Sequence, residues 1–400
     1  MIRLITIATS GTTPEVMQRR RPVAARVAVL IIFAVCGIGV SNWVPRIPEV
    51  RRALELSEGL LGFALLFPAP GALVSMPFAG WLVARWGSRP ATRLLSLCFC
   101  AVLPLPVLAW NLPSLAFALL LFGAGIGSLD VAMNSQAVAV ETQYRRPILS
   151  TFHAAFSFGA LGGAVIGGWA AELGIDLVPH MVAVGAILLV VSAVGSRWLL
   201  PAHTDAGDHG PAFAVPSRPL MLLGVIAFCA LVAEGAAADW SAVYLQDYLH
   251  TSKGLAAAGF AAFSLTMAVM RLGGDRIAAR WGAVTTVRLG GVIAALGLGL
   301  GLFAAHPVAA MLGFGALGVG IANIFPIVLS AAGRMPGLGT APAIAAMTTM
   351  GYSGFLVGPP LIGFLAELVT LPVALAVVVL LCALIALLAG TIVPAASPDS

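Results

Sequence analysis

The stretch Ala84-Arg85-Trp86-Gly87 occurs twice, and its second copy is Ala279-Arg280-Trp281-Gly282, 195 positions later (279 − 84). The same offset relates Ala171-Glu172-Leu173 to Ala366-Glu367-Leu368. It also relates Gly159, Leu161, Gly163 and Gly168 to Gly354, Leu356, Gly358 and Gly363, and a slightly shorter offset relates Gly125, Gly127 and Asp130 to Gly318, Gly320 and Asn323. A repeat that holds over so many positions predicts two halves of one design.

The composition indicates a membrane protein. Hydrophobic residues make up 60% of the chain and charged residues 9%, whereas a soluble domain is roughly 45–50% apolar and about 25% charged. The cysteines lie in apolar runs without zinc-ligand spacing, so we interpret them as small buried hydrophobic residues and predict no metal and no cofactor. The net charge of +5 does not indicate a nucleic-acid partner, because the basic residues fall in short loops.

Apolar stretches of about 20 residues can span a bilayer. We predict twelve of them: residues 23–45, 58–84, 94–110, 112–138, 147–171, 179–200, 218–245, 254–275, 285–305, 307–331, 341–366 and 370–393. The predicted fold is an all-α membrane protein whose twelve transmembrane helices form two pseudo-symmetric six-helix bundles, residues 23–200 and 218–394. The remaining segments are an N-terminal tail (1–22), a polar linker (201–217) and a C-terminal tail (395–400).

Lysine and arginine predict the orientation, because they concentrate in cytoplasmic loops. The tail and the even-to-odd loops hold most of them, and the other loops hold Arg46, Arg51, Arg52 and Lys253. We therefore expect a multi-pass protein of the inner (plasma) membrane with both termini in the cytoplasm.

The loop after the second span reads Gly80-Trp-Leu-Val-Ala-Arg85-Trp-Gly87-Ser-Arg89. It resembles the signature loop of the major facilitator superfamily, Gly-x-Leu-x-Asp-Arg-x-Gly-Arg-Lys/Arg, with Ala84 in place of the Asp. The second half carries the related set Arg271, Asp275, Arg276, Arg280 and Gly282. The resemblance implies a latch that holds the outward-open state, and the missing Asp puts the first-half latch in doubt. The alternative is that these arginines only set topology.

A second group of residues sharpens the resemblance. Asp130-Val-Ala-Met-Asn134, His153, and Glu234 followed by Asp239-Trp240 resemble the YbjJ-like branch of that superfamily, near the fucose permeases. This resemblance implies a transporter, and only weakly a sugar or polyol substrate.

Charged groups inside a membrane mark functional positions, since one at the bilayer centre costs at least about 2.5–3.5 kcal/mol. Glu234 is the first candidate for a proton-carrying carboxylate, and its alternative is a structural residue paired with an arginine. Asp130 is the second; it could bind substrate, take the proton or hold His153 in place. Asn134 lies one helical turn from Asp130 and shares its face. His153 and Asn323 are candidate substrate ligands or, alternatively, helix-packing residues, and Arg271 is expected to pair with Asp275.

The first helices of the two halves end in similar residues, Asn42-Trp43 and Asp239-Trp240, the latter followed by Tyr244. They could stack against and hydrogen-bond a sugar ring, together with Tyr352, or they could anchor the helices at the membrane interface. Glycines at 159, 162, 163, 167, 354 and 358 are expected to form sliding seams between the halves.

We therefore predict a monomeric secondary active transporter that moves a small polar organic solute, sugar- or polyol-like, by alternating access coupled to protons. Its partners are the lipid bilayer, the solute and protons. A proton-driven exporter of drugs or metabolites is the first alternative, and a non-transporting sensor built on a carrier fold is the second. No nucleophile–base pair or phosphate loop stands out in the sequence, so an enzyme is not predicted.

Overall fold

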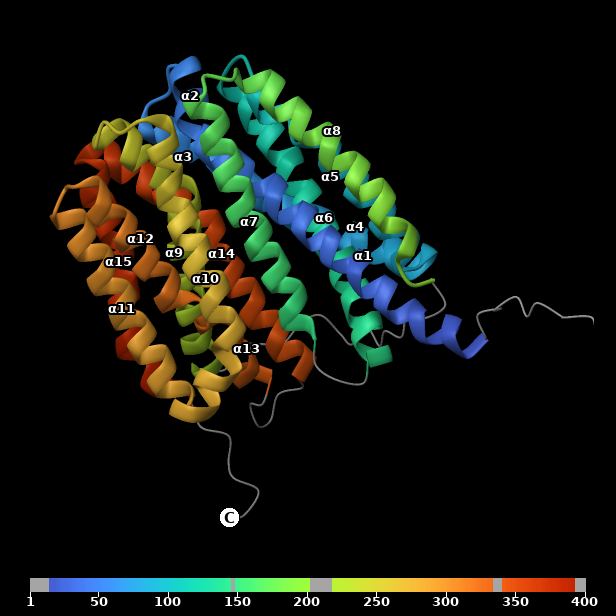
Figure 1. The fold of residues 1–400 in the computed structure, drawn as a ribbon. Coiled ribbons are helices and arrows are strands. Elements are labelled where there is room, and N and C mark those ends of the chain that lie inside the picture. The colour runs from blue at the N-terminus through green and yellow to red at the C-terminus, as the bar shows by residue number, and fades with distance from the viewer. Residues whose placement is uncertain (1–13, 145–147, 202–217, 334–339, 393–400) are drawn as a thin grey trace, which may run out of the picture.

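The computed structural model describes residues 14–144, 148–201, 218–333 and 340–392. Within these ranges there is no β-strand, and Figure 1 shows long helices arranged in two groups. Twelve helical segments are long and apolar enough to cross a membrane, which confirms the predicted number. The predicted tails and linker fall largely outside the described residues.

The membrane spans of the two halves correspond one to one in their order, although some spans consist of two helices. The first half contains α1 (Pro14–Trp43), α2 (Ile47–Ala53), α3 (Glu58–Leu65), α4 (Pro68–Trp86), α5 (Ser88–Val102), α6 (Leu112–Tyr144), α7 (Leu149–Glu172) and α8 (Leu177–Gly195). The second half contains α9 (Arg218–Val243), α10 (Lys253–Trp281), α11 (Ala283–Phe303), α12 (Pro307–Ile321), α13 (Ile324–Gly333), α14 (Thr340–Leu368) and α15 (Leu371–Leu388). Short 3₁₀ turns η1 (Val44–Arg46), η2 (Leu105–Leu108), η3 (Ser196–Trp198) and η6 (Ala389–Thr391) and a π-turn η5 (Tyr244–Tyr248) extend or join them.

The helix ends confirm the repeat. Ser57 caps the start of α3 by accepting the N–H of Leu60, and Ser252, 195 positions later (252 − 57), caps α10 by accepting the N–H of Leu255. At the other end of this pair of spans, Gly87 terminates α4 with φ 85° and Gly282 terminates α10 with φ 79°. Only glycine adopts such a backbone without strain, so the repeated glycine is required by the shared geometry.

Two predicted spans each consist of two α-helices. The second span consists of α3 and α4, and Pro68 is the first residue of α4. Proline lacks an N–H and crowds the preceding turn, so it starts a helix more readily than it continues one. The tenth span consists of α12 and α13, which separate at Ala322 and Asn323.

The glycines predicted to form the seams between the bundles pack inside their own bundle or face open space, so that prediction is wrong. Gly159 and Gly163 lie against the backbone of Ala34 and Ile38 in α1, and Gly354 lies against Phe228 in α9. Gly167 and Gly358 likewise face their own bundle, and Gly162 faces open space.

The contacts between bundles use two other glycines of the repeat. Gly168 of α7 lies against Ala257 of α10, and Gly363 of α14 lies against Gly62 of α3. The helix pairs α7–α10 and α3–α14 therefore form the two seams between the halves.

The two bundles meet at one end of the molecule. We define the closed end as the end that holds α2, the starts of α3 and α10, and the ends of α7 and α14. Cross-bundle ion pairs and helix contacts gather there. In Figure 1 the bundles meet near α2 and α3 and diverge toward the opposite end, which we call the splayed end.

Candidate substrate site

An ion pair lies in the second bundle. Arg271 of α10 places Nη2 3.6 Å from Oε2 of Glu234 on α9, and both side chains are about one quarter exposed. Nε of Arg271 also donates to the backbone oxygen of Ala322. The expected partner of Arg271 was Asp275, whose side chain lies outside the described residues. The structure instead matches the alternative considered for Glu234, a carboxylate paired with an arginine.

The first bundle contributes Asp130, a carboxylate whose hydrogen-bond partner is an amide. Asn134 donates from Nδ2 to Oδ1 of Asp130 at 3.0 Å and to its backbone oxygen at 2.9 Å. The predicted shared face of these two α6 residues is therefore present. Among the described residues, Asp130 has no basic partner within ion-pair distance. Its contacts also do not include His153, so the geometry gives no support to the expectation that it holds that ring.

His153 and Tyr352 each lie near charged residues of the other bundle. His153 on α7 is exposed, its ring stands edge-on to Phe33 at 5.3 Å, and it lies near Arg271. Tyr352 on α14 is within electrostatic reach of both Asp130 and Glu234, and it packs edge-on against Phe325 and Phe355. The charged side chains of both bundles therefore face one common region.

Asn323 makes its contacts with α10. Its Nδ2 donates to the backbone oxygen of Met270, and its amide packs directly over Gly274, where an added Cβ would come within 2.1 Å of Oδ1. The residue joins the α12–α13 break to α10. This contact supports the helix-packing role that the sequence left open, and the contact with substrate stays a prediction.

The paired aromatic residues at the ends of α1 and α9 are buried. Trp43 is 4% exposed, and Trp240 and Tyr244 are fully buried. The interface-anchor interpretation is therefore wrong for these residues, because an anchor must reach the lipid headgroups. Exposed tryptophans at helix ends fit that role better: Trp86, Trp110, Trp169, Trp198 and Trp281.

The buried ends also carry polar atoms without partners. Among the described residues, Oδ1 of Asn42, Nε1 of Trp240 and the hydroxyl of Tyr244 have no hydrogen bond. Asn42 donates only to Ile38, one turn before it. Asp239 is partly buried beside them in the sequence. Unpaired buried polar groups are costly. We therefore expect these atoms to form hydrogen bonds in another state of the protein.

The predicted latch residues contact only their own bundle. The guanidinium of Arg85 lies over the Trp81 ring at 5.6 Å, and Arg89 donates to the backbone oxygen of Arg197. Arg276 and Arg280 are exposed, and Gly80 faces open space. No contact between these described residues joins the two bundles, which agrees with their position at the splayed end.

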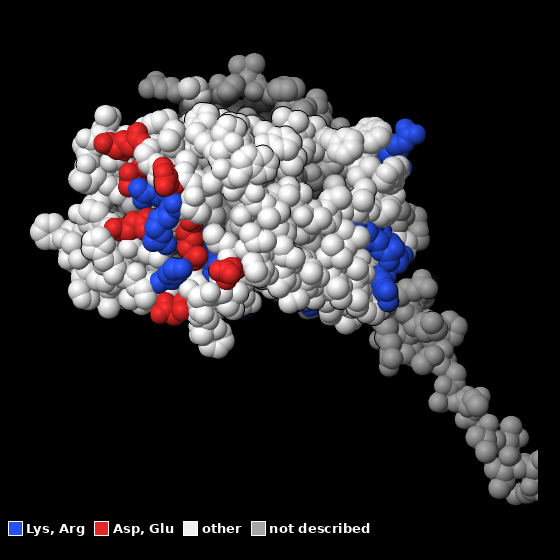
Figure 2. All heavy atoms as spheres, turned by 90° about the horizontal axis from the view of Figure 1, so that it is seen from above, with Lys and Arg blue, Asp and Glu red and all other residues white. Residues whose placement is uncertain are grey.

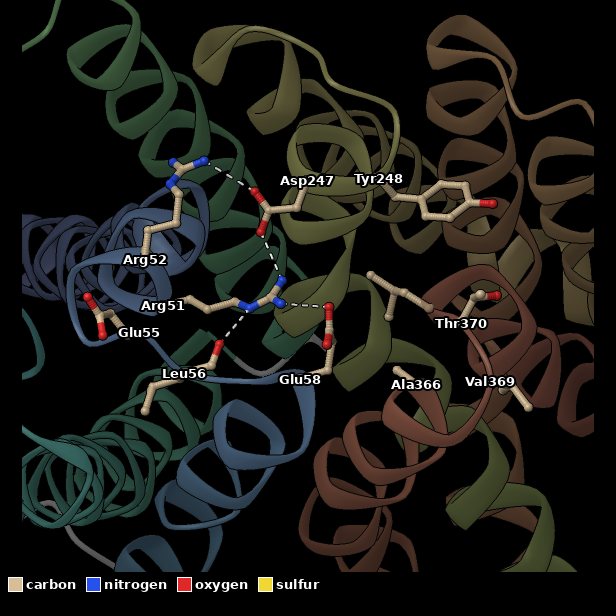
Figure 3. Close-up of a pocket in the computed structure, with 11 residues that line it drawn as sticks. Arg51, Arg52, Glu55, Leu56, Glu58, Asp247, Tyr248, Ala366, Val369 and Thr370 are labelled. Carbon is tan, nitrogen blue, oxygen red and sulfur yellow. Dashed lines mark hydrogen bonds and ion pairs between the residues drawn. The ribbon is translucent and has the colours of Figure 1, made fainter.

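Sequence reasoning missed a charged cluster at the closed end. Arg51 and Arg52 of α2 both pair with Asp247 of the other bundle, at 3.0 and 3.2 Å, and Lys253 pairs with Glu49 at 3.4 Å. Figure 2 shows acidic and basic side chains gathered on one part of this face. Figure 3 shows Arg51 between Asp247 and Glu58, and these three residues line a cavity of about 620 Å³.

The repeat could have revealed part of that cluster. Arg52 and Asp247 are separated by 195 positions, so each occupies the repeat position of the other. A residue that touches its own repeat equivalent must lie close to the pseudo-symmetry axis. Opposite charges at such a pair of positions are therefore a sequence signal for contact between the bundles.

Two six-helix bundles that share a charged interior define the class of multi-pass membrane transporters, and not an enzyme. The sequence pattern of the Major Facilitator Superfamily matches residues 29–341 and 241–400, so the chain belongs to that superfamily. The predicted recognition and fold class are confirmed at this level, whereas the finer YbjJ-like branch stays a prediction.

Relatives cover most of the chain. An uncharacterized MFS-type transporter of Yersinia pestis is 36% identical over 90% of this chain and 93% of its own length. The membrane protein MosC of Rhizobium meliloti is 34% identical over 87% of this chain and 85% of its own.

Solved structures share the fold at low sequence identity. The nucleoside transporter NupG aligns with a TM-score of 0.72 at 14% identity, covering 93% of this chain and 98% of its own. The Escherichia coli fucose:proton symporter FucP aligns with a TM-score of 0.60 at 16% identity, covering 92% and 98%.

Proposed function

We propose that this transporter moves a small polar organic solute, sugar- or polyol-like, across the inner membrane by alternating access coupled to protons. The observation that carries the proposal is the common region formed by Asp130 and His153 of one bundle and Glu234, Arg271 and Tyr352 of the other. A site built from both bundles changes its accessible side when the bundles rock about it.

The proposed orientation of the protein in the membrane follows from the distribution of its charged residues. The arginines of the signature loops lie at the splayed end, whereas the closed end carries acidic residues as well as basic ones (Figure 2). Since arginine-rich loops face the cytoplasm, the splayed end is proposed to be cytoplasmic. The structure then corresponds to a state that is shut toward the outside.

Asp130 is the better of the two candidates for carrying the coupling proton. The charge of Glu234 is balanced by Arg271, while the charge of Asp130 is met only by the amide of Asn134. An unbalanced carboxylate inside a membrane is costly, so a proton stabilises it when no cationic partner is present. This reverses the order of preference that the sequence suggested.

The first step is to screen neutral sugars, polyols and lipophilic cations for thermal stabilisation of the purified protein. A ligand is identified by this screen because binding stabilises the folded state. With that ligand in proteoliposomes, Asp130→Asn should lose accumulation against a gradient but keep exchange of the ligand. Neutral asparagine cannot take up and release the coupling proton.

Glu141→Gln is the matched control, since Glu141 is a carboxylate on the same helix outside the site. Its Oε2 accepts the N–H groups of Ile148 and Leu149, and glutamine keeps an acceptor there. Unchanged accumulation in Asp130→Asn would refute the coupling role of Asp130. Stabilisation by lipophilic cations alone would instead support export of such compounds.

A further inference from the structure

The two seams between the bundles end in repeat-related glutamates at the closed end. Glu172 is the last residue of α7, and its Oε2 accepts the backbone N–H of Gly254 at 2.7 Å. Gly254 is the second residue of α10, directly after the cap formed by Ser252. The first N–H groups of a helix lack partners within the helix and carry partial positive charge, so a carboxylate is favoured there.

Glu367 occupies the equivalent position on the other seam. It lies in the last turn of α14, and its carboxylate packs on Gly59, the second residue of α3 after the Ser57 cap. Glu367 follows Glu172 by 195 positions (367 − 172), and Gly254 follows Gly59 by the same number (254 − 59). The two carboxylates therefore occupy equivalent positions, each against the second residue of a helix in the other bundle.

Glycine makes both contacts possible. An added Cβ on Gly59 would lie 2.5 Å from Oε2 of Glu367, and one on Gly254 would lie 2.9 Å from Oε2 of Glu172. A methyl group at either position would displace the carboxylate from the start of the helix. Both repeat positions are therefore glycines, and each glycine faces a glutamate of the other bundle across its seam.

We infer that Glu172 and Glu367 are a symmetric pair of locks that hold the closed end shut. Each carboxylate belongs to one bundle and lies on a helix start of the other. When the bundles part at this end, Glu172 exchanges the N–H of Gly254 for water and Glu367 leaves the start of α3, so both contacts favour the closed state. The inference concerns the conformational equilibrium and does not depend on which solute is carried.

The expected size of the effect follows from the interaction of an anion with a helix start. Such an interaction corresponds to about a two- to five-fold change in an equilibrium constant at an exposed site. The two locks lie on different seams and share no partner, so their effects should multiply. Removing both should raise the ratio of opened to closed molecules about four- to twenty-five-fold.

The test measures the distance between the bundles at the closed end by pulsed electron resonance. Spin labels would be placed at Trp110→Cys and Phe303→Cys, two exposed positions away from the locks, after Cys98→Ser removes the exposed native thiol. Gly59→Ala with Gly254→Ala should increase the population at longer distance by the factor given above. Glu172→Gln with Glu367→Gln changes no volume and should shift the same population in the same direction.

Gly162→Ala is the matched control, because Gly162 lies on α7 and faces open space. It should leave the distance distribution unchanged. The inference would be overturned if the paired alanine and paired glutamine variants both kept the parental distribution. It would equally be overturned if Gly162→Ala shifted the distribution as much as the paired alanine variant.

Discussion

At the residue scale, the charges of the central region are unevenly balanced. Glu234 and Arg271 lie 3.6 Å apart, whereas Asp130 faces only an amide. Removing one member of a partly buried ion pair leaves the other without compensation, which is worse than removing both. The pair is therefore expected to behave as a unit.

Glu234→Gln and Arg271→Gln should each lower the melting temperature of the purified protein, because each strands one charge inside the membrane region. The double variant should melt above the value expected from adding the two losses, with a coupling of about 1 kcal/mol. Thermal unfolding in one detergent measures all four proteins. Strict additivity would show that the two side chains do not interact.

The sequence identified these charged residues but did not show which side chains on other helices they would contact. Asp130 and Asn134 are four positions apart on one helix, so their contact follows from helical geometry. The partner of Arg271 lies on another helix, and the relative rotation of two helices is not visible in their sequences. The same reason explains why the contact of Asn323 with Gly274 could not be predicted.

At the element scale, the repeated glycines Gly87 and Gly282 fix where α4 and α10 end. Both have positive φ with an extended ψ, a region that residues with a Cβ avoid. The signature loop was recognised from these glycines. The sequence did not reveal that its arginines would contact only their own bundle, because the conformational state of a transporter is not encoded in one loop.

Gly87→Ala and Gly282→Ala should each destabilise the protein by about 1–3 kcal/mol, the cost of forcing a Cβ into that backbone region. Gly80→Ala, in the same loop motif, should be neutral or stabilising, since Gly80 lies in a helix and faces open space. Melting temperatures compare the three variants. Equal losses at all three positions would rule out backbone conformation as the cause.

At the scale of the whole molecule, the repeat and the long apolar stretches predicted two bundles of six spans, and the structure agrees. The closed end could not be predicted in the same way, because it depends on contacts between helices far apart in the chain. The sequence indicates the closed end only through pairs of residues separated by the repeat offset, such as Arg52 with Asp247 and Glu172 with Glu367.

The buried ends of α1 and α9 relate the closed end of the molecule to the proposed transport cycle. Trp43 and Trp240 occupy corresponding places in the two halves and are both buried in this state. Opening the closed end is expected to expose their polar neighbours, including the hydroxyl of Tyr244, which has no partner among the described residues here. The sugar-stacking role of these residues stays a prediction, and it concerns the state that opens on that side.

Proton movement driven by solute tests the proposed transport activity most directly. Proteoliposomes would be placed in weakly buffered medium without a gradient, and the external pH would be recorded as each neutral sugar, polyol or lipophilic cation is added. The account predicts that a sugar or polyol makes the medium more alkaline, because the solute enters with protons, and that Asp130→Asn abolishes the signal. A pH change with lipophilic cations but with no sugar or polyol would contradict it.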